Sequence, residues 1–116
     1  MADRNRRRDG NQRRETLTPE GVIKNRLVLF LRGLTPVPYY FFPATHGYGR
    51  SGVPDVVGCW NGRFFAIEVK AEGKARNTTA LQDRELHLVR NSGGISFVYD
   101  GTISDMELMD LMEGKK

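Results

Sequence analysis

The feature that most restricts the fold is the dipeptide Asn61-Gly62, which lies between two runs of β-prone residues. Asn-Gly in this setting predicts a two-residue hairpin turn, because both residues tolerate the positive φ angles that the turn requires. We therefore expect the flanking runs, Val53–Trp60 and Arg63–Lys70, to pair as antiparallel strands. A turn of two residues also determines which residues of the two strands face each other.

Two acidic residues become neighbours in this hairpin. Counting back from the turn places Asp55 directly opposite Glu68, and opposed residues point to the same face of a sheet. Apolar residues surround both positions, so the sheet is expected to be mostly buried. Buried like charges must be neutralised by a proton or by a cation. Mg²⁺ suits this need, because it binds one or two carboxylates together with water and phosphate oxygens.

A lysine completes the arrangement. Lys70 lies two residues beyond Glu68 and projects from the same face of the predicted strand. Its amine can position or deprotonate a water molecule, or hold a phosphate oxygen, during in-line attack on a phosphodiester. The competing interpretation is a plain salt bridge between Glu68 and Lys70 on a solvated face. A β-bulge in either strand would shift the register by one residue and separate the two carboxylates.

The rest of the chain predicts a mixed α/β domain with one β-sheet flanked by helices. Thr18 and Pro19 are typical of the cap and first position of a helix. The aromatic, proline-containing stretch 37–43 favours an edge strand. The other expected elements are the end of the first helix near Arg32, a helix capped by Thr78 or Thr79 and ending near Asn91, a strand at 95–99, and a helix that follows a Ser104 cap and ends near Met112.

The positive charge of the chain is concentrated at its N-terminus. Residues 1–14 contain six arginines and two aspartates, a net charge of +4, which equals that of the whole chain. We expect residues 1–16 to form a disordered basic arm and residues 17–116 to fold as a single domain. The arm either attracts a phosphate backbone or only keeps the chain in solution.

Several classes of protein are disfavoured. No apolar run approaches the roughly 20 residues that span a bilayer, and no secretory signal is visible. A single cysteine, Cys59, excludes an internal disulfide and a cysteine cluster for zinc, and we expect it in the core. A cytoplasmic protein without membrane contact is therefore expected.

Two further polar residues have competing interpretations. Glu20 lies on the apolar stripe of the first helix, which favours a place in the site, but an acid in a first turn also stabilises the helix dipole. Gln82 follows Thr79 at the spacing of a capping box, so it serves either the helix backbone or the site.

Three basic residues near the predicted site are candidates for phosphate contacts. Arg50 lies in the glycine-rich loop 44–52, and Lys74 and Arg76 follow the second hairpin strand. Such contacts position DNA without reading its sequence.

A longer pattern resembles the VRR-NUC domain of the PD-(D/E)xK nuclease superfamily. The resemblance extends from about Pro19 to Tyr99. The family's valine–arginine–arginine signature has no match, because Leu88-Val89-Arg90 is followed by asparagine. The matching residues are Glu20, the segment 49–55 (GRSGVPD), the segment 62–70 (GRFFAIEVK), Gln82 and the pair Gly93-Gly94.

The resemblance implies a restriction-endonuclease-like core and a site for Mg²⁺ or Mn²⁺. Asp55, Glu68 and the backbone carbonyl of Val69 would bind the metal, and Glu20 would complete the site. Lys70 would be the catalytic lysine, and the amide side chain of Gln82 would lie beside the site.

The resemblance also implies a function. Stand-alone members of the family, from bacteria and phages, act on branched DNA and are similar to homodimeric enzymes that resolve Holliday junctions. We therefore expect a DNA endonuclease that cuts four-way junctions as a homodimer, in the cytoplasm of a bacterium or a phage-infected cell. Stretch 37–43 could supply dimer contacts. The alternatives are a nuclease acting on flaps or other duplex DNA, and a catalytically silent DNA-binding or assembly module.

Overall fold

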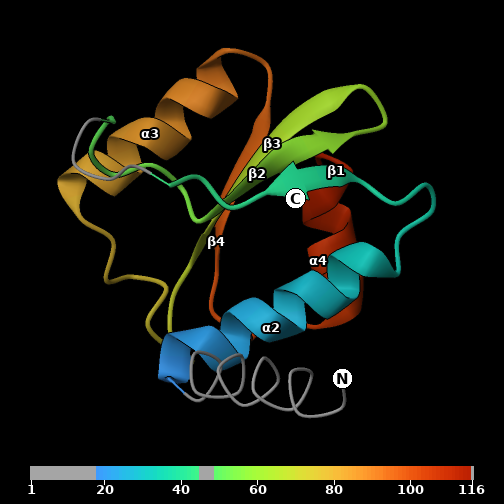
Figure 1. The fold of residues 1–116 in the computed structure, drawn as a ribbon, viewed down its shortest axis with the longest axis horizontal. Helices are drawn as coiled ribbons and strands as arrows, with labels where there is room; N and C mark the ends of the chain where they lie inside the picture. Colours follow the sequence, from blue (N-terminus) through green and yellow to red (C-terminus); the bar gives the residue numbers. More distant parts are fainter. Residues whose placement is uncertain (1–17, 45–48, 116) are drawn as a thin grey trace, which may run out of the picture.

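The computed structural model describes residues 18–44 and 49–115 (Figure 1). The basic arm predicted over residues 1–16 lies outside these residues. The helices and strands follow the predicted order, which confirms the α/β class. They are α2 (Pro19–Arg32), β1 (Tyr39–Phe41), β2 (Val56–Trp60), β3 (Arg63–Val69), α3 (Ala80–Asn91), β4 (Ile95–Tyr99) and α4 (Asp105–Met112).

The four described strands form one mixed sheet in the order β1-β2-β3-β4. The β1–β2 and β2–β3 pairs are antiparallel, whereas β3 and β4 run parallel and are joined through α3. Helices α2 and α4 lie on one side of the sheet and α3 lies on the other (Figure 1). The sheet is therefore the middle layer, and α3 covers a different face from α2 and α4.

The hairpin has the predicted register. Trp60 pairs with Arg63, and four further pairs follow without a bulge as far as Val56 and Ile67. Asn61 and Gly62 have φ angles of 51° and 78°, as a two-residue turn with positive φ at both positions requires. Continuing this register by one residue sets Asp55 opposite Glu68, although the observed pairing ends at Val56.

Strand β2 begins later than predicted. The expected start was Val53, but pairing begins at Val56, because Pro54 has no backbone N–H to donate to a ladder. The residues before Val56 instead form part of a loop against α3, in which Gly52 has a φ angle of 78°. Asp55 consequently lies at the junction between this loop and the hairpin.

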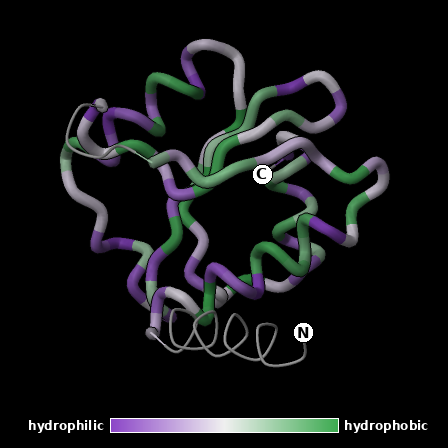
Figure 2. The backbone as a smooth tube through the Cα atoms, viewed as in Figure 1, coloured by the Kyte–Doolittle hydropathy of each residue, from purple (hydrophilic) through white to green (hydrophobic). Residues whose placement is uncertain are grey.

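The core lies between the sheet and helices α2 and α4. Residues spaced along one side of α2, Ile23, Leu27 and Leu31, are buried as the sequence periodicity predicts. They belong to one cluster with Val56 and Ile67 of the hairpin. Figure 2 shows the hydrophobic stretches running along the central strands. Burial of each such side chain stabilises the fold by about 1.5–3 kcal/mol.

The opposite face of the sheet is only partly covered. Cys59, expected in the core, is exposed, and Phe64 opposite it is 48% exposed. Both lie near the hairpin turn, and Phe64 lines a hollow with Leu88 and Val89 of α3. Within the described residues, no helix combines the length and hydrophobicity needed to cross a membrane.

Candidate active site

Asp55 and Glu68 come together at the end of the hairpin away from the Asn61-Gly62 turn, just beyond the pair Val56 and Ile67. The Oδ2 atom of Asp55 accepts a hydrogen bond from the backbone N–H of Val69 at 2.8 Å, which holds the carboxylate against β3. Glu68 precedes Val69, and its side chain is only 5% exposed. The unbulged register therefore places two acidic groups side by side at the edge of the core.

This arrangement is electrostatically unfavourable for two negative charges. Burial, and next the neighbouring charge of Asp55, are the main causes that together raise the pKa of Glu68 from 4.5 to about 8. Lys70 acts in the opposite direction, and Glu20 adds to the increase. In the absence of a cation, the Glu68 carboxyl therefore retains a proton at neutral pH.

Lys70 and Gln82 form a closed set of contacts with Glu68. The Lys70 Nζ atom lies 3.6 Å from the Glu68 Oε2 atom and donates a hydrogen bond to the Gln82 Oε1 atom at 3.0 Å. The Gln82 Nε2 atom in turn donates to the Glu68 Oε2 atom at 3.0 Å. The three side chains therefore hold one another in a single orientation.

Gln82 also serves the capping box of α3. Its Oε1 atom accepts a hydrogen bond from the backbone N–H of Thr79 at 2.9 Å, and the Thr79 hydroxyl accepts one from the backbone N–H of Gln82. The two interpretations of Gln82 are thus compatible. Because two donors occupy its oxygen, its amide nitrogen is directed to Glu68, and the helix cap orients the site.

Glu20 approaches the acidic pair from a different element. Thr18 caps α2 by accepting a hydrogen bond from the backbone N–H of Gly21, which places Glu20 in the first turn. Glu20 is exposed, yet its charge contributes to the raised pKa of Glu68. Its carboxylate therefore lies within electrostatic reach of the pair while remaining accessible to solvent.

The donor set fits a hard divalent cation. Among the described residues, no group of three His, Cys, Asp or Glu side chains is arranged to hold a metal ion. The Asp55 and Glu68 carboxylates nevertheless supply two oxygen ligands, and Mg²⁺ commonly uses one or two carboxylates with water and phosphate oxygens. A cation would also neutralise the charge that burial disfavours.

A cleft leads from the surface to Asp55. It has a volume of about 470 Å³ and is lined by Pro43, by the loop over residues 49–55 and by Gln82. A cavity of this size is within the range of ligand-binding sites. Asp55 is therefore reached from the side on which the loop and α3 meet.

Arg50 has a contact that the sequence did not predict. Its Nε and Nη2 atoms donate to the two carboxylate oxygens of Glu85 at 3.0 and 2.7 Å. The Glu85 side chain is only 8% exposed, whereas that of Arg50 is 64% exposed. The pair holds the loop against α3. The available signal was the position of Glu85, three residues after Gln82 and thus on the same side of the helix.

The other two basic candidates lie in the loop between β3 and α3. Lys74 and Arg76 are exposed, and no ion pair joins either of them to another residue of the described segments. The loop is anchored between them, because the backbone N–H of Ala75 donates to the Asp100 Oδ2 atom at 3.1 Å. Both basic groups remain free to meet a polyanion.

The close approach of the loop to α3 can be tested at Gly52. A Cβ atom there would lie 2.5–2.8 Å from backbone atoms of Leu81 and Gln82, at a φ angle of 78°. We expect Gly52→Ala to lower the free energy of unfolding by about 2–4 kcal/mol, through strain and overpacking. Gly62→Ala is the control, because Gly62 has the same φ with open space around it and should lose only about 1–2 kcal/mol. Equal losses in urea unfolding would refute the tight docking.

Comparison with known proteins adds no relative. No model of a protein family, no curated protein and no solved structure matches the chain.

Proposed function

We propose that the chain is a metal-dependent DNA endonuclease whose reaction takes place at Asp55, Glu68 and Lys70. The observation that carries the proposal is the pairing of two adjacent carboxyl groups with one amine on a mostly buried sheet face. A simple salt bridge would need one acid and one base. The second carboxylate is explained if a cation binds between them.

Each residue has a defined part in the proposed reaction. Asp55, Glu68 and the carbonyl of Val69 would hold Mg²⁺ or Mn²⁺, which supplies charge neutralisation and Lewis acidity when bound. Lys70 holds a phosphate oxygen or orients the attacking water. Gln82 fixes the Lys70 amine through its 3.0 Å hydrogen bond. Glu20 completes the site from α2.

The proposed substrate is DNA, most specifically branched DNA. The exposed Lys74 and Arg76 and the arginine-rich N-terminus support binding to a phosphate backbone. The resemblance to the VRR-NUC domain supports the nuclease chemistry, a restriction-endonuclease-like core and four-way junctions as targets. The mixed sheet with helices on both faces is compatible with such a core.

Symmetric cutting of a four-way junction needs two active sites, so the proposal includes a homodimer with two-fold symmetry. Exposed apolar side chains of β1 and the hairpin, Tyr39, Phe41 and Phe64, offer a surface for it. Sedimentation should show a dimer at the concentrations used for cleavage assays. A strict monomer would leave flaps or other duplex DNA as the better targets.

Metal binding separates a nuclease from a silent DNA-binding module. We expect calorimetry to detect Mg²⁺ or Mn²⁺ binding by the unmodified chain, and Asp55→Asn or Glu68→Gln to abolish it, because each removes an anionic ligand. Glu113→Gln, at the end of α4, is the control and should bind normally. Metal binding that survives both site substitutions would refute the site.

A cleavage panel then identifies the target. Four-way junction, flap, splayed arm and linear duplex are incubated with Mg²⁺ and each of these proteins. Preferential cutting of the junction, lost in Asp55→Asn and Glu68→Gln, is the expected result. Equal cutting of linear duplex would refute the junction assignment. No cutting of any substrate would favour the silent module.

A further inference from the structure

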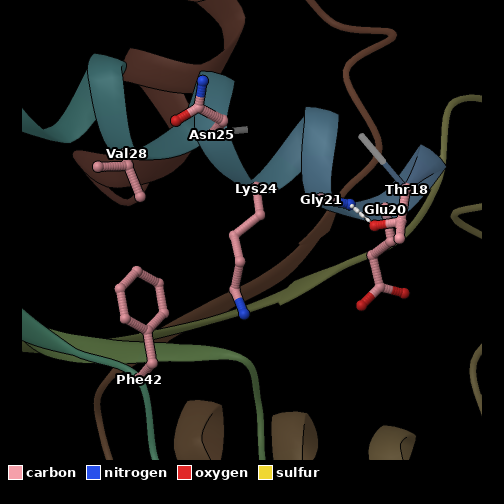
Figure 3. Close-up of a pocket in the computed structure, with 7 residues that line it drawn as sticks. All are labelled: Thr18, Glu20, Gly21, Lys24, Asn25, Val28 and Phe42. Atoms are coloured by element: carbon pink, nitrogen blue, oxygen red, sulfur yellow. Dashed lines mark hydrogen bonds between the residues drawn. The ribbon is translucent and has the colours of Figure 1, made fainter. Parts of the chain in front are cut away.

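A second hollow, distinct from the cleft already described, opens beside Glu20. It has a volume of about 320 Å³ and lies between the first turns of α2 and Phe42, which follows β1 (Figure 3). Its polar lining includes Lys24 and Asn25. Lys24 and Asn25 were not singled out by the sequence, although Lys24 follows Glu20 by one helical turn, whereas Phe42 belongs to the stretch 37–43, which was expected to form an edge strand.

Lys24 is held in this hollow by an aromatic ring. Its Nζ atom lies 4.8 Å from the centroid of the Phe42 ring, within the range of a cation–π contact. Lys24 is half-buried, so the contact restricts an otherwise mobile side chain. The ammonium group is therefore held beside the Phe42 ring and does not move freely in the solvent.

The ammonium group is not neutralised by a neighbouring acid. Glu20 and Lys24 have the spacing and order that favour an ion pair on a helix, yet none forms within 4 Å among the described residues. Figure 3 shows the two side chains extending separately from α2. Glu20 instead acts on Glu68 of the candidate site. Lys24 consequently keeps donors for an external anion.

The hollow and the cleft are lined by consecutive residues of the segment that follows β1. Phe42 lines the hollow, and the next residue, Pro43, lines the cleft. Glu20 belongs to the first cavity and Asp55 to the second, and the charges of both act on Glu68. A chain of phosphates that crosses the acidic pair from the cleft would thus continue toward Lys24.

We propose that this hollow binds the DNA backbone beside the scissile phosphate, with Lys24 as the phosphate-contacting residue and Phe42 as the residue that positions it. The proposal rests on the nuclease function proposed above. The contact is to phosphate, so it does not discriminate between base sequences. Asn25 lines the same hollow, and its neutral side chain can form hydrogen bonds there.

Binding of a fluorescein-labelled duplex to the full chain, followed by anisotropy without metal, tests the proposal. Lys24→Gln should weaken binding and reduce the slope of log Kd against log salt by about 0.9, the value for one phosphate contact. Between 50 and 200 mM salt, its affinity should therefore fall by a factor about 3.5-fold smaller than that of the unmodified chain. Arg32→Gln, which removes one charge from the other end of α2, should keep the original slope. Equal slopes for Lys24→Gln and the unmodified chain would overturn the proposal.

Phe42→Leu separates positioning from direct contact. If Phe42 acts through Lys24, the double variant should bind no more weakly than Lys24→Gln alone. Additive losses would overturn the positioning role. Inorganic phosphate, added at constant ionic strength, should displace the duplex equally from the unmodified chain and from Lys24→Gln. Selective displacement would identify a site for free phosphate and overturn the backbone assignment.

The two proposals can fail independently. A reduced salt slope in Lys24→Gln, with no cleavage of any DNA in Mg²⁺, would retain the binding surface and refute the nuclease. Cleavage that requires Glu68, with unchanged DNA binding in Lys24→Gln, would retain the nuclease and refute the hollow.

Discussion

Replacing Lys70 with methionine should lower the rate of DNA cleavage about 10²- to 10⁴-fold, the range expected when a positioned proton-transfer group is lost. Methionine retains most of the side-chain volume but cannot hold a phosphate oxygen or orient water. Its thioether also cannot donate to the Gln82 Oε1 atom, which is 3.0 Å from the Lys70 amine. The loss should appear in single-turnover rates measured with saturating DNA and Mg²⁺.

Metal binding distinguishes this effect from collapse of the site. Lys70 lowers the pKa of Glu68, so its removal should raise that pKa and make cation binding require a higher pH. Calorimetry above pH 8 should therefore still detect Mg²⁺ or Mn²⁺ in Lys70→Met. Lys115→Met, at the exposed C-terminal end, is the charge-matched control. Full cleavage activity in Lys70→Met would show that the lysine has no part in the reaction.

The metal-free protein should become less stable as the pH rises from about 4.5 to about 8. Burial and the charge of Asp55 raise the pKa of Glu68 from 4.5 to about 8. The folded state therefore holds a proton that the unfolded state releases in this range. This contribution to the free energy of unfolding is fully present below about pH 4.5. It is lost as the pH rises to about 8, where Glu68 ionises in the folded protein, by at most about 1.4 kcal/mol per pH unit.

Glu68→Gln should remove this dependence, because glutamine has no proton to release. At pH 8 or above, the metal-free variant should have a higher free energy of unfolding than the unmodified chain. Urea unfolding across the pH range measures both effects. A stability profile that is equally steep with and without Glu68 would contradict the assignment of the titration to this residue.

Added cation should reverse the order of stability. A ligand that binds only the folded state stabilises it by mass action, so Mg²⁺ or Mn²⁺ should raise the stability of the unmodified chain at pH 8. It should leave Glu68→Gln unchanged. An equal increase in both proteins would place the bound cation elsewhere.

The hairpin and its consequences were predictable from local chemistry. Asn61 and Gly62 accept the positive φ angles of a short turn, and strand alternation then carries the register as far as Asp55 and Glu68. No distant contact is needed for that inference. The same reasoning located the caps at Thr18 and Ser104 and narrowed the cap of α3 to Thr78 or Thr79, of which the structure shows Thr79, because capping depends on residues within one helical turn.

Other features required the packing of elements that are distant in the sequence. The ion pair between Arg50 and Glu85 joins a loop to a helix, and the contact of Lys24 with Phe42 joins a helix to the end of a strand. Cys59 was expected in the core, yet it is exposed. Periodicity specifies which face a residue occupies but not what covers that face.

Gln82 combines contacts that the sequence predicted with contacts that depend on tertiary packing. Its spacing from Thr79 already predicted a helix cap, because that hydrogen bond forms within one turn. Its bonds to Lys70 and Glu68 depend on α3 crossing the sheet beside β3. Turn chemistry and side-chain alternation thus determined the register that pairs the two carboxylates. Only the tertiary packing of α2, α3 and the loop around them decided which groups surround that pair, because those contacts join residues that local geometry does not bring together.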